Sequence, residues 1–241
     1  MGIKIVKIKS KENILKHIEI KRIKHINYAE GIFKILNERL LTYEEYRKLN
    51  DKEKEKFTNE GFVIGQHSLQ TLQEWIENDK NYIITAELRS GEDKEIIGFT
   101  LILGTEDIQD LVRKYAKQII FEKEAYKKII SKNDFLYLIQ ICVAKNFSNL
   151  KIGTKIIDES FKLINKAIVS FVIKSPIQNK ASLYFHLKNG FRYLGDYLGD
   201  YGDFKNYSST GLIYIQKNPP IMNSDILNLI EYINKEKRES E

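Results

Sequence analysis

The apolar run DFLYLIQICVA, from Asp134 to Ala144, constrains the possible fold of this chain more than any other segment. Its residues are mostly apolar and favour extended structure, which is typical of a strand that is covered on both faces. A short polar stretch follows, and apolar residues then recur at helical spacing from Asn149 to Asn165. The segment therefore predicts a central strand that leads through a turn into a helix.

Comparable patterns extend along the rest of the chain. Alternating or short apolar runs predict further strands at residues 18–26, 82–88, 95–103, 167–173, 191–197 and 209–216. Helical periodicity predicts helices at residues 28–40, 42–60, 69–76, 106–130, 179–189 and 225–235. The predicted fold class is α/β, a single domain with a mixed central sheet of about six to seven strands flanked by helices.

Three of these segments carry more detailed expectations. Residues 42–60 are rich in charge and are expected to form one exposed helix. The helix at 106–130 is expected to present Leu111, Tyr115, Ile119 and Ile120 on one face. The short echo YLGDYLGDYGD, residues 193–203, is expected to lie between two strands.

Composition limits the class of protein. The 241 residues are 42% hydrophobic and 30% charged, which is ordinary for a globular protein with a sizeable core. One cysteine excludes an intramolecular disulfide, and no apolar run is long enough to span a membrane. The N-terminal segment alternates apolar and charged residues, so it does not resemble a secretory signal. We therefore expect a cytoplasmic protein that does not insert into a membrane.

The formal net charge of +6 allows two interpretations. A positive surface can attract a polyanion, either a nucleic acid or the phosphates of a cofactor. Alternatively, the charge reflects a sequence generally rich in lysine, which is interspersed with glutamate and aspartate. The second interpretation is favoured, because no arginine-rich stripe with interleaved aromatic residues is present. A nucleic acid is therefore not the expected partner.

Two segments are candidates for chemistry. In the first, from Leu138 to Asp158, the start of a helix presents unpaired backbone N–H groups that suit a pyrophosphate, and Gly153 allows a close approach. Alone, this segment is more typical of strand–turn–helix units that bind nothing. The second segment, from Asn179 to Tyr197, is a short helix that ends at Gly190 and leads into a strand.

Together, in this order and at this separation, the two segments resemble the GNAT superfamily of N-acetyltransferases. Members have a strand that ends in Val, the turn Arg/Gln-x-x-Gly-x-Gly/Ala and a helix, followed later by Asn, a short helix with a Tyr, and Gly-Phe. The matching positions here are Val143, Ser148, Lys151, Gly153, Asn179, Ser182, His186 and Gly190-Phe191. The resemblance covers roughly residues 16–217, with helical additions at about 42–67 and 105–131, and residues 218–241 are then a helical tail.

The chain departs from the family pattern at three kinds of position. Ser148 lacks the long Arg or Gln side chain, and Lys151 replaces a glycine, so the turn must accept a Cβ there. Gln140 stands where many members have a carboxylate, and His186 stands at the helix Tyr. The combination of Gln140-Ile141-Cys142-Val143 with a helix histidine is similar to a subgroup of the superfamily that has Gln-x-Cys-Val.

The resemblance implies an enzyme that transfers an acetyl group from acetyl-CoA to an amine, which attacks the thioester directly in a ternary complex. The implied cofactor-binding residues are Ile141, Cys142, Val143, Ser148, Asn149, Lys151, Ile152, Gly153, Thr154 and Asn179. His186 is the candidate general acid for the leaving thiolate, or else a helix histidine that packs beside the cofactor. An alternative from another class is a GNAT-fold protein that binds acyl-CoA as a sensor or scaffold without turnover.

The sequence leaves several features open. Asp196, Asp200 and Asp203 are candidates to attract the amine or accept its proton, although Gly-Asp pairs are also common in turns. A strand-buried Cys142 is expected to be inert, and the other histidines show no metal-ligand spacing, so no metal is predicted. The acceptor amine is not identified, and both a monomer and a homodimer are compatible with the sequence.

Overall fold

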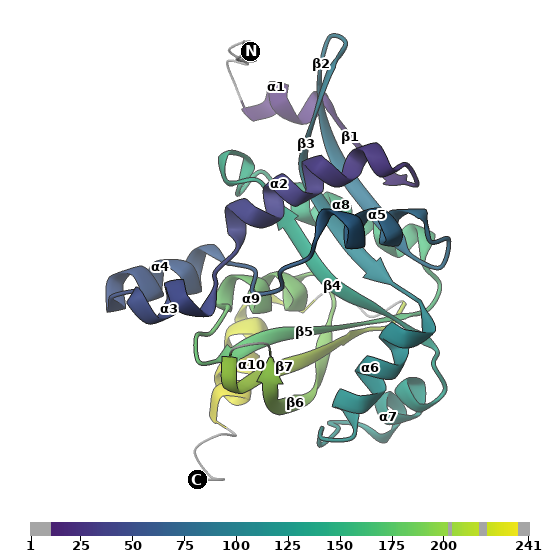
Figure 1. Ribbon diagram of the computed structural model, residues 1–241. Helices are drawn as coiled ribbons and strands as arrows, with labels where there is room; N and C mark the ends of the chain where they lie inside the picture. Colours follow the sequence, from purple (N-terminus) through teal and green to yellow (C-terminus); the bar gives the residue numbers. More distant parts are fainter. Residues whose placement is uncertain (1–10, 202–203, 217–220, 236–241) are drawn as a thin grey trace. The chain divides into compact units, whose positions relative to one another are not determined.

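The computed structural model describes residues 11–201, 204–216 and 221–235 (Figure 1). Over these residues the strands form one mixed seven-stranded sheet in the order β1-β2-β3-β4-β5-β7-β6. The strands are β1 Ile18–Ile23, β2 Tyr82–Ser90, β3 Asp93–Leu103, β4 Phe135–Val143, β5 Ala167–Ser175, β6 Arg192–Tyr201 and β7 Phe204–Tyr214. The predicted α/β class, with a mixed sheet and flanking helices, is confirmed.

The chain divides into two compact units. The first comprises Met1–Leu40, Gly65–Leu103 and Gln140–Ile164, and the second comprises Leu41–Ile64, Gly104–Ile139 and Asn165–Glu241. Strand β4 contributes residues to both units. Each unit is described by itself below.

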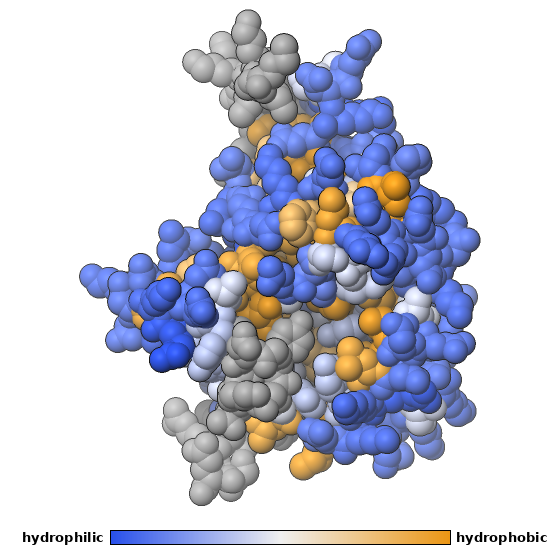
Figure 2. Space-filling view, viewed as in Figure 1, coloured by the Kyte–Doolittle hydropathy of each residue, from blue (hydrophilic) through white to orange (hydrophobic). Residues whose placement is uncertain are grey.

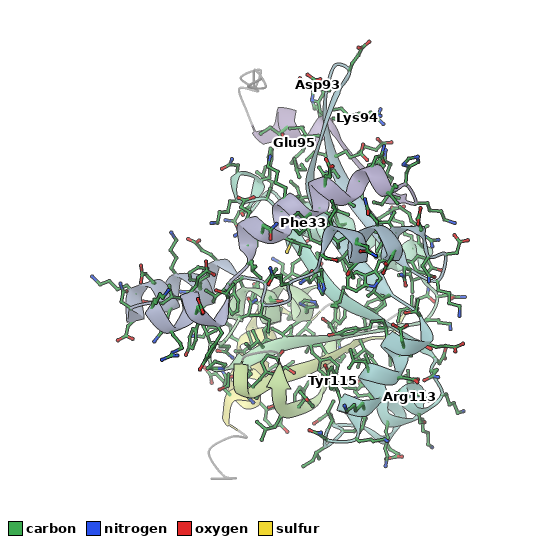
Figure 3. The ribbon with its side chains drawn as sticks, viewed as in Figure 1. Phe33, Asp93, Lys94, Glu95, Arg113 and Tyr115 are labelled. Carbon is green, nitrogen blue, oxygen red and sulfur yellow. The ribbon has the colours of Figure 1, made fainter. Side chains whose placement is uncertain are left out.

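The first unit is built on antiparallel strands β1, β2 and β3. Ile18 pairs with Leu88 in β2, and Tyr82 pairs with Ile102 in β3. The β2–β3 hairpin turns at Gly91, whose φ of 65° lies in the left-handed region that glycine adopts without strain. Asp93, which opens β3, lies beside this turn and is labelled in Figure 3. The strands predicted at 82–88 and 95–103 therefore form a hairpin.

Two helices of this unit lie on opposite faces of the strand pair β2–β3. Helix α8 (Ile152–Leu163) packs Ile152 and Ile156 against Ile97 in β3. The adjacent residue Ile96 points to the other face, where its side chain contacts the backbone of Gly31 in helix α2 (Ala29–Arg39). Each face of the sheet is thus covered by one amphipathic helix.

The remaining helices of the first unit have local sequence causes. Helix α5 (Leu69–Glu77) begins after Ser68, whose Oγ accepts a hydrogen bond from Thr71 N and so caps the helix. It packs against α2 through Leu72 and Ile76, which are buried. The short segments α1 (Lys11–Lys16), η1 (Ile26–Tyr28) and η2 (Lys145–Phe147) complete the unit.

In the second unit, β4 and β5 are parallel and the other strands are antiparallel. The β4–β5 pairing joins Phe135–Tyr137 to Ala167–Val169, and β7 lies between β5 and β6. Strand β6 continues to Tyr201, so the prediction that the echo at 193–203 lies between strands is wrong for residues 193–201. Its glycines serve within the strand, since Gly195 stands where the β6–β7 register shifts.

The charged segment at 42–60 forms two helices and not one. Helix α3 (Tyr43–Lys48) and helix α4 (Asp51–Glu60) each start with a reciprocal capping box, at Thr42 with Glu45 and at Asn50 with Glu53. These boxes stop one helix and start the next. The outer surface of the pair is mostly hydrophilic (Figure 2).

An aromatic cluster forms the core beneath these helices. It contains the buried residues Leu41, Phe62, Ile119, Ile173, Ile177, Tyr197 and Tyr207, with partly buried Tyr43, Tyr46, Leu49, Phe57, Ile64, Tyr115, Phe121 and Phe171 packed against them. The ring of Tyr115, labelled in Figure 3, lies 4.8 Å from that of Tyr197 and 5.9 Å from that of Phe171. These distances suit offset and edge-to-face aromatic packing.

The prediction of one helix at 106–130 is also wrong. Helix α6 (Glu106–Ala116) ends before a bend, and helix α7 (Glu124–Ser131) follows it. The buried face of α6 contains Ile108, Val112 and Ala116, so Leu111 is exposed. Ile120 lies in the connection and is 91% exposed, whereas Tyr115 and Ile119 do join the core as expected.

Helices α9 (Lys180–Lys188) and α10 (Asn223–Lys235) complete the second unit and contact each other. The helix predicted at 225–235 is therefore present, while the rest of the predicted tail, residues 218–220 and 236–241, lies outside the described residues. In the described part of the chain, no helix is both long and apolar enough to cross a membrane.

Candidate functional site

The end of β4 presents backbone groups to both of its edges. Ala144 N donates to Ile97 O in β3 at 2.9 Å. Because backbone groups alternate along a strand, those of Ile141 and Val143 point to the edge away from β3. The side chain of Gln140 is buried, and its Nε2 donates to Gly65 O at 3.1 Å. The predicted cofactor strand therefore turns a hydrogen-bonding edge away from its antiparallel partner.

The turn between β4 and α8 contains two residues in the left-handed conformation. Asn149 has φ 64° and Lys151 has φ 59°, which is a conformation that glycine adopts most easily. Lys151 therefore has a backbone conformation that suits glycine, the residue that the GNAT pattern has at this position. Asparagine tolerates such a φ well, and lysine does so at some cost.

This turn leaves the start of α8 open. Lys151 is the N-cap residue and makes no side-chain capping hydrogen bond, and the first intrahelical bond of this region runs from Lys155 N to Lys151 O. The N–H groups of Ile152, Gly153 and Thr154 therefore have no intrahelical acceptor. Together with the positive end of the helix dipole, they make this turn suited to an anion.

Arg39 is a residue of this site that sequence reasoning missed. It is the last residue of α2, and its Nη2 donates to Ser148 Oγ at 2.6 Å and to Val143 O at 3.1 Å. Its Nε also donates to Val143 O, at 3.2 Å. No local motif announces this contact, because the partners are more than one hundred residues apart in the chain.

Cys142 is buried and chemically quiet. It is 7% exposed, and burial raises the pKa of its thiol to about 12, although the positive charge of Arg39 acts in the opposite direction. A thiol with this pKa carries almost no thiolate near neutral pH, and the thiolate is the reactive form. The structure thus agrees with the expectation that this cysteine belongs to the core.

We expect Cys142 to resist thiol reagents in the folded protein. With Ellman's reagent at pH 8, the native protein should release almost no chromophore, and the protein in guanidinium chloride should release one equivalent, since the chain has a single cysteine. Cys142→Ala should cost roughly 1 kcal/mol of stability through lost packing and should keep any cofactor affinity. Fast stoichiometric labelling of the native protein would contradict this assignment.

Asn179, in the second unit, acts as the cap of α9. Its Oδ1 accepts a hydrogen bond from Ser182 N at 3.1 Å, and its Nδ2 donates to Phe62 O at 2.8 Å. The residue is 6% exposed. An amide offers two donors and two acceptor positions, so one of each remains for a ligand.

His186 is held in one tautomer. Its Nδ1 lies 2.7 Å from the carbonyl oxygen of Ser182, which can only accept, so the hydrogen sits on Nδ1. Its Nε2 is buried and has no hydrogen-bond partner among the described residues. The ring packs edge-on against Phe185 and Phe191.

Burial also sets the charge of this ring. His186 is 2% exposed, and this burial lowers its pKa to about 4, although the bond to Ser182 O opposes the shift. Near pH 7 the imidazole is therefore neutral and has no proton on Nε2 to donate. This geometry favours the packing alternative over the general-acid role expected from the sequence.

The candidate general bases have different outcomes. The carboxylate of Asp196 forms an ion pair with the ammonium of Lys174, which is itself buried and also donates to Ile233 O at 2.5 Å. Asp196 thus has a structural partner. Asp203 and the side chain of Asp200 lie outside the described residues. In the described part of the chain, no group of three or more histidine, cysteine, aspartate or glutamate residues could hold a metal ion.

The fold is similar to those of solved N-acetyltransferases. One is the ribosomal-protein-S18-alanine N-acetyltransferase from Escherichia coli, with a TM-score of 0.51 and 10% identity over 85% of this chain and 95% of that chain. Another is NAA60 from Arabidopsis thaliana in complex with acetyl-CoA, with a TM-score of 0.52 and 15% identity over 82% of this chain and 99% of that chain. The fold is that of the GNAT N-acetyltransferases.

Sequence comparison adds no relative to this GNAT fold. No protein-family model matches the chain, and no curated protein matches it in sequence. At 10% and 15% identity, the two structures support the fold, while the roles of individual residues depend on the local geometry described above.

Proposed function

We propose that this protein is an N-acetyltransferase that moves an acetyl group from acetyl-CoA to an amine. The observation that carries the proposal is the turn at Ser148–Thr154, which has two left-handed residues and an uncapped helix start within a GNAT fold. Acetyl-CoA would supply an activated thioester, and attack by the amine joins nitrogen to the acetyl carbon and breaks the carbon–sulfur bond.

The residues of the first unit have distinct roles in this proposal. The backbone edge of Ile141–Val143 pairs with the amide groups of the pantetheine arm, as a neighbouring strand would. The N–H groups of Ile152, Gly153 and Thr154 bind the pyrophosphate, with Ser148, Asn149 and Lys151 shaping the turn. Cys142 contributes only to the core beneath this edge.

The residues of the second unit have supporting roles. Asn179 caps α9 and keeps one amide hydrogen, so we propose it as a residue that donates to the cofactor. His186, neutral in this geometry, keeps an acceptor at Nε2, so the role that we propose for it is to orient a donor and not to protonate the thiolate. The proton released by the amine then goes to solvent or to a base outside these residues.

Calorimetry with acetyl-CoA tests the cofactor site. Gly153→Trp should weaken binding roughly tenfold or more, because a large side chain at the second position of α8 occupies the space in front of the N–H groups. Asp158→Trp is the matched control, since this residue is exposed on the same helix, and it should keep the affinity of the unaltered protein. Equal binding by all three proteins would place the cofactor elsewhere.

Turnover separates the enzyme from its non-catalytic alternative. The unaltered protein should release the thiol of CoA when it is given acetyl-CoA and a panel of small amines and peptides with free amino groups. The assay with Ellman's reagent is clean, because the one cysteine of the chain is buried. Tight binding of acetyl-CoA without thiol release from any amine would support the sensor or scaffold instead.

A further inference from the structure

The guanidinium of Arg39 is only partly used by its protein partners. Within the part of the chain that the structure describes, Nε and Nη2 make its three hydrogen bonds, two to Val143 O and one to Ser148 Oγ. A guanidinium has five N–H donors, so both hydrogens on Nη1 remain. Among the described residues no carboxylate pairs with Arg39, although the residue is half-buried. The hydrogens on Nη1 can therefore bind an anionic ligand.

The guanidinium of Arg39 lies beside Ser148, the position at which the turn lacks a long polar side chain. Ser148 stands where the GNAT motif has an Arg or Gln side chain, and its short hydroxyl carries no positive charge. Arg39 donates to that same hydroxyl at 2.6 Å. A guanidinium therefore lies beside the turn, but it comes from α2 and not from the motif itself. Because a guanidinium is planar and forked, it suits bidentate binding of phosphate oxygens.

We propose that Arg39 supplies the cationic side chain for the cofactor pyrophosphate that the turn does not supply at Ser148. This inference rests on the proposed function. In this arrangement Nη1 meets a phosphate oxygen, while Nε and Nη2 keep the guanidinium oriented through Val143 O and Ser148 Oγ. Removal of the Arg39 side chain then lowers the affinity for ligands that carry the pyrophosphate and leaves the affinity for ligands without it unchanged.

The competing role is purely structural. Arg39 fastens the end of α2 to the carbonyl oxygen of Val143, and Val143 belongs to the edge proposed to pair with pantetheine. If this fastening were its whole contribution, removing the side chain would disturb the pantetheine edge. Ligands with and without phosphates would then lose affinity to the same extent. The two roles therefore differ in their dependence on the ligand.

The experiment compares three ligands across four proteins. Acetyl-CoA, acetyl-dephospho-CoA, which lacks only the 3′-phosphate, and S-acetylpantetheine, which has no phosphate, are titrated by calorimetry or, for weak binding, by protein-observed NMR. The proteins are the unaltered chain, Arg39→Ala, Arg39→Lys and Lys34→Ala. The last is the matched control, because Lys34 is an exposed cation of the same helix.

We expect Arg39→Ala to weaken both CoA ligands about tenfold or more and S-acetylpantetheine less than about twofold. Arg39→Lys should recover part of the loss, and Lys34→Ala should change nothing. A fifth protein, the double variant Arg39→Ala/Ser148→Arg, should restore CoA binding by placing a guanidinium at the family position.

Two results would overturn the inference. An equal loss for all three ligands would assign Arg39 to backbone positioning, and no loss would remove it from the site. Thermal denaturation of each variant shows whether a loss comes from unfolding, and Arg39→Lys then carries the comparison if Arg39→Ala is unstable. If the unaltered protein does not bind acetyl-CoA at all, the proposed function fails first and this inference fails with it.

Discussion

Replacing Gly195 with alanine is expected to lower the free energy of unfolding by about 4 kcal/mol. Gly195 has a φ of 140°, where side chains other than hydrogen are strained. A Cβ built there would lie 2.4 Å from Ile120 O and 2.5 Å from Ile119 Cγ2. The nearest of these atoms is the backbone oxygen of Ile120, so side-chain rotation alone cannot relieve the contact.

The surrounding hydrogen bonds make the collision hard to avoid. Glu122 N donates to Leu194 O at 3.1 Å, which ties the connection after α6 to β6 next to Gly195. A shift that removed the clash would break this bond or move Ile119 out of the aromatic core. Chemical denaturation followed by circular dichroism measures the loss directly.

Gly91→Ala is the matched control for this experiment. Gly91 also has a positive φ, 65°, but no atom lies within 4 Å of a Cβ built there. Its substitution should therefore cost only the conformational strain, about 1 kcal/mol. If both variants lose the same small amount, the close approach of Ile120 to β6 is not a fixed feature of the fold.

The elements predicted correctly are those in which hydrophobic pattern and local signals agree. The run before Val143 is rich in apolar residues that favour extended structure, and Ser68 precedes α5 as an N-cap, a position that serine favours. The prediction of a single helix at 42–60 was wrong, although the sequence contains the start signals of two helices. The spacing of Thr42 with Glu45 and of Asn50 with Glu53 is the capping-box pattern. The segment was interpreted from its high charge, and this pattern was overlooked.

Two wrong predictions concern features of the fold that the local sequence pattern does not determine. The glycines of the 193–203 echo suggested a turn, but Gly195 lies within β6. Its lack of a side chain allows the close approach of Ile120. The apolar side chain of Ile120 itself suggested a buried helix face, and it is exposed because α6 ends at Ala116. The first error concerns a contact between segments that are distant in sequence, and the second concerns the position at which a helix ends.

In the candidate site, too, some features follow from the local sequence and others depend on tertiary contacts. The turn after β4 and the helix that follows it were predicted from the sequence, but the left-handed conformation of Asn149 and Lys151 was not. Arg39 was not predicted either, because its helix reaches Ser148 only through the packing of α2 on the sheet. The proton on Nδ1 of His186 likewise depends on its distance to Ser182 O and on the rings around it, which no motif encodes.

Acidification is expected to destabilise this protein through His186. Its pKa is about 6.5 in an unfolded chain and is lowered to about 4 in the fold by burial. The unfolded state therefore binds the extra proton first as the pH falls. The stability that depends on the neutral ring is complete above pH 6.5 and is lost progressively down to about pH 4, by about 3 kcal/mol in total.

Comparison of variants isolates this contribution from other titrating groups. His186→Asn keeps a donor for Ser182 O and removes the titration, so its free energy of unfolding should depend less on pH between 6.5 and 4, even if its stability at pH 7 is lower. His67→Asn is the control: burial also lowers the pKa of His67, but this variant should keep the whole contribution of His186. Denaturation curves measured across this pH range give both slopes.

A slope for His186→Asn equal to that of the unaltered protein would mean that the ring is solvated and able to hold a proton. The general-acid role would then become the better assignment for His186, and the pH dependence of turnover should follow its titration.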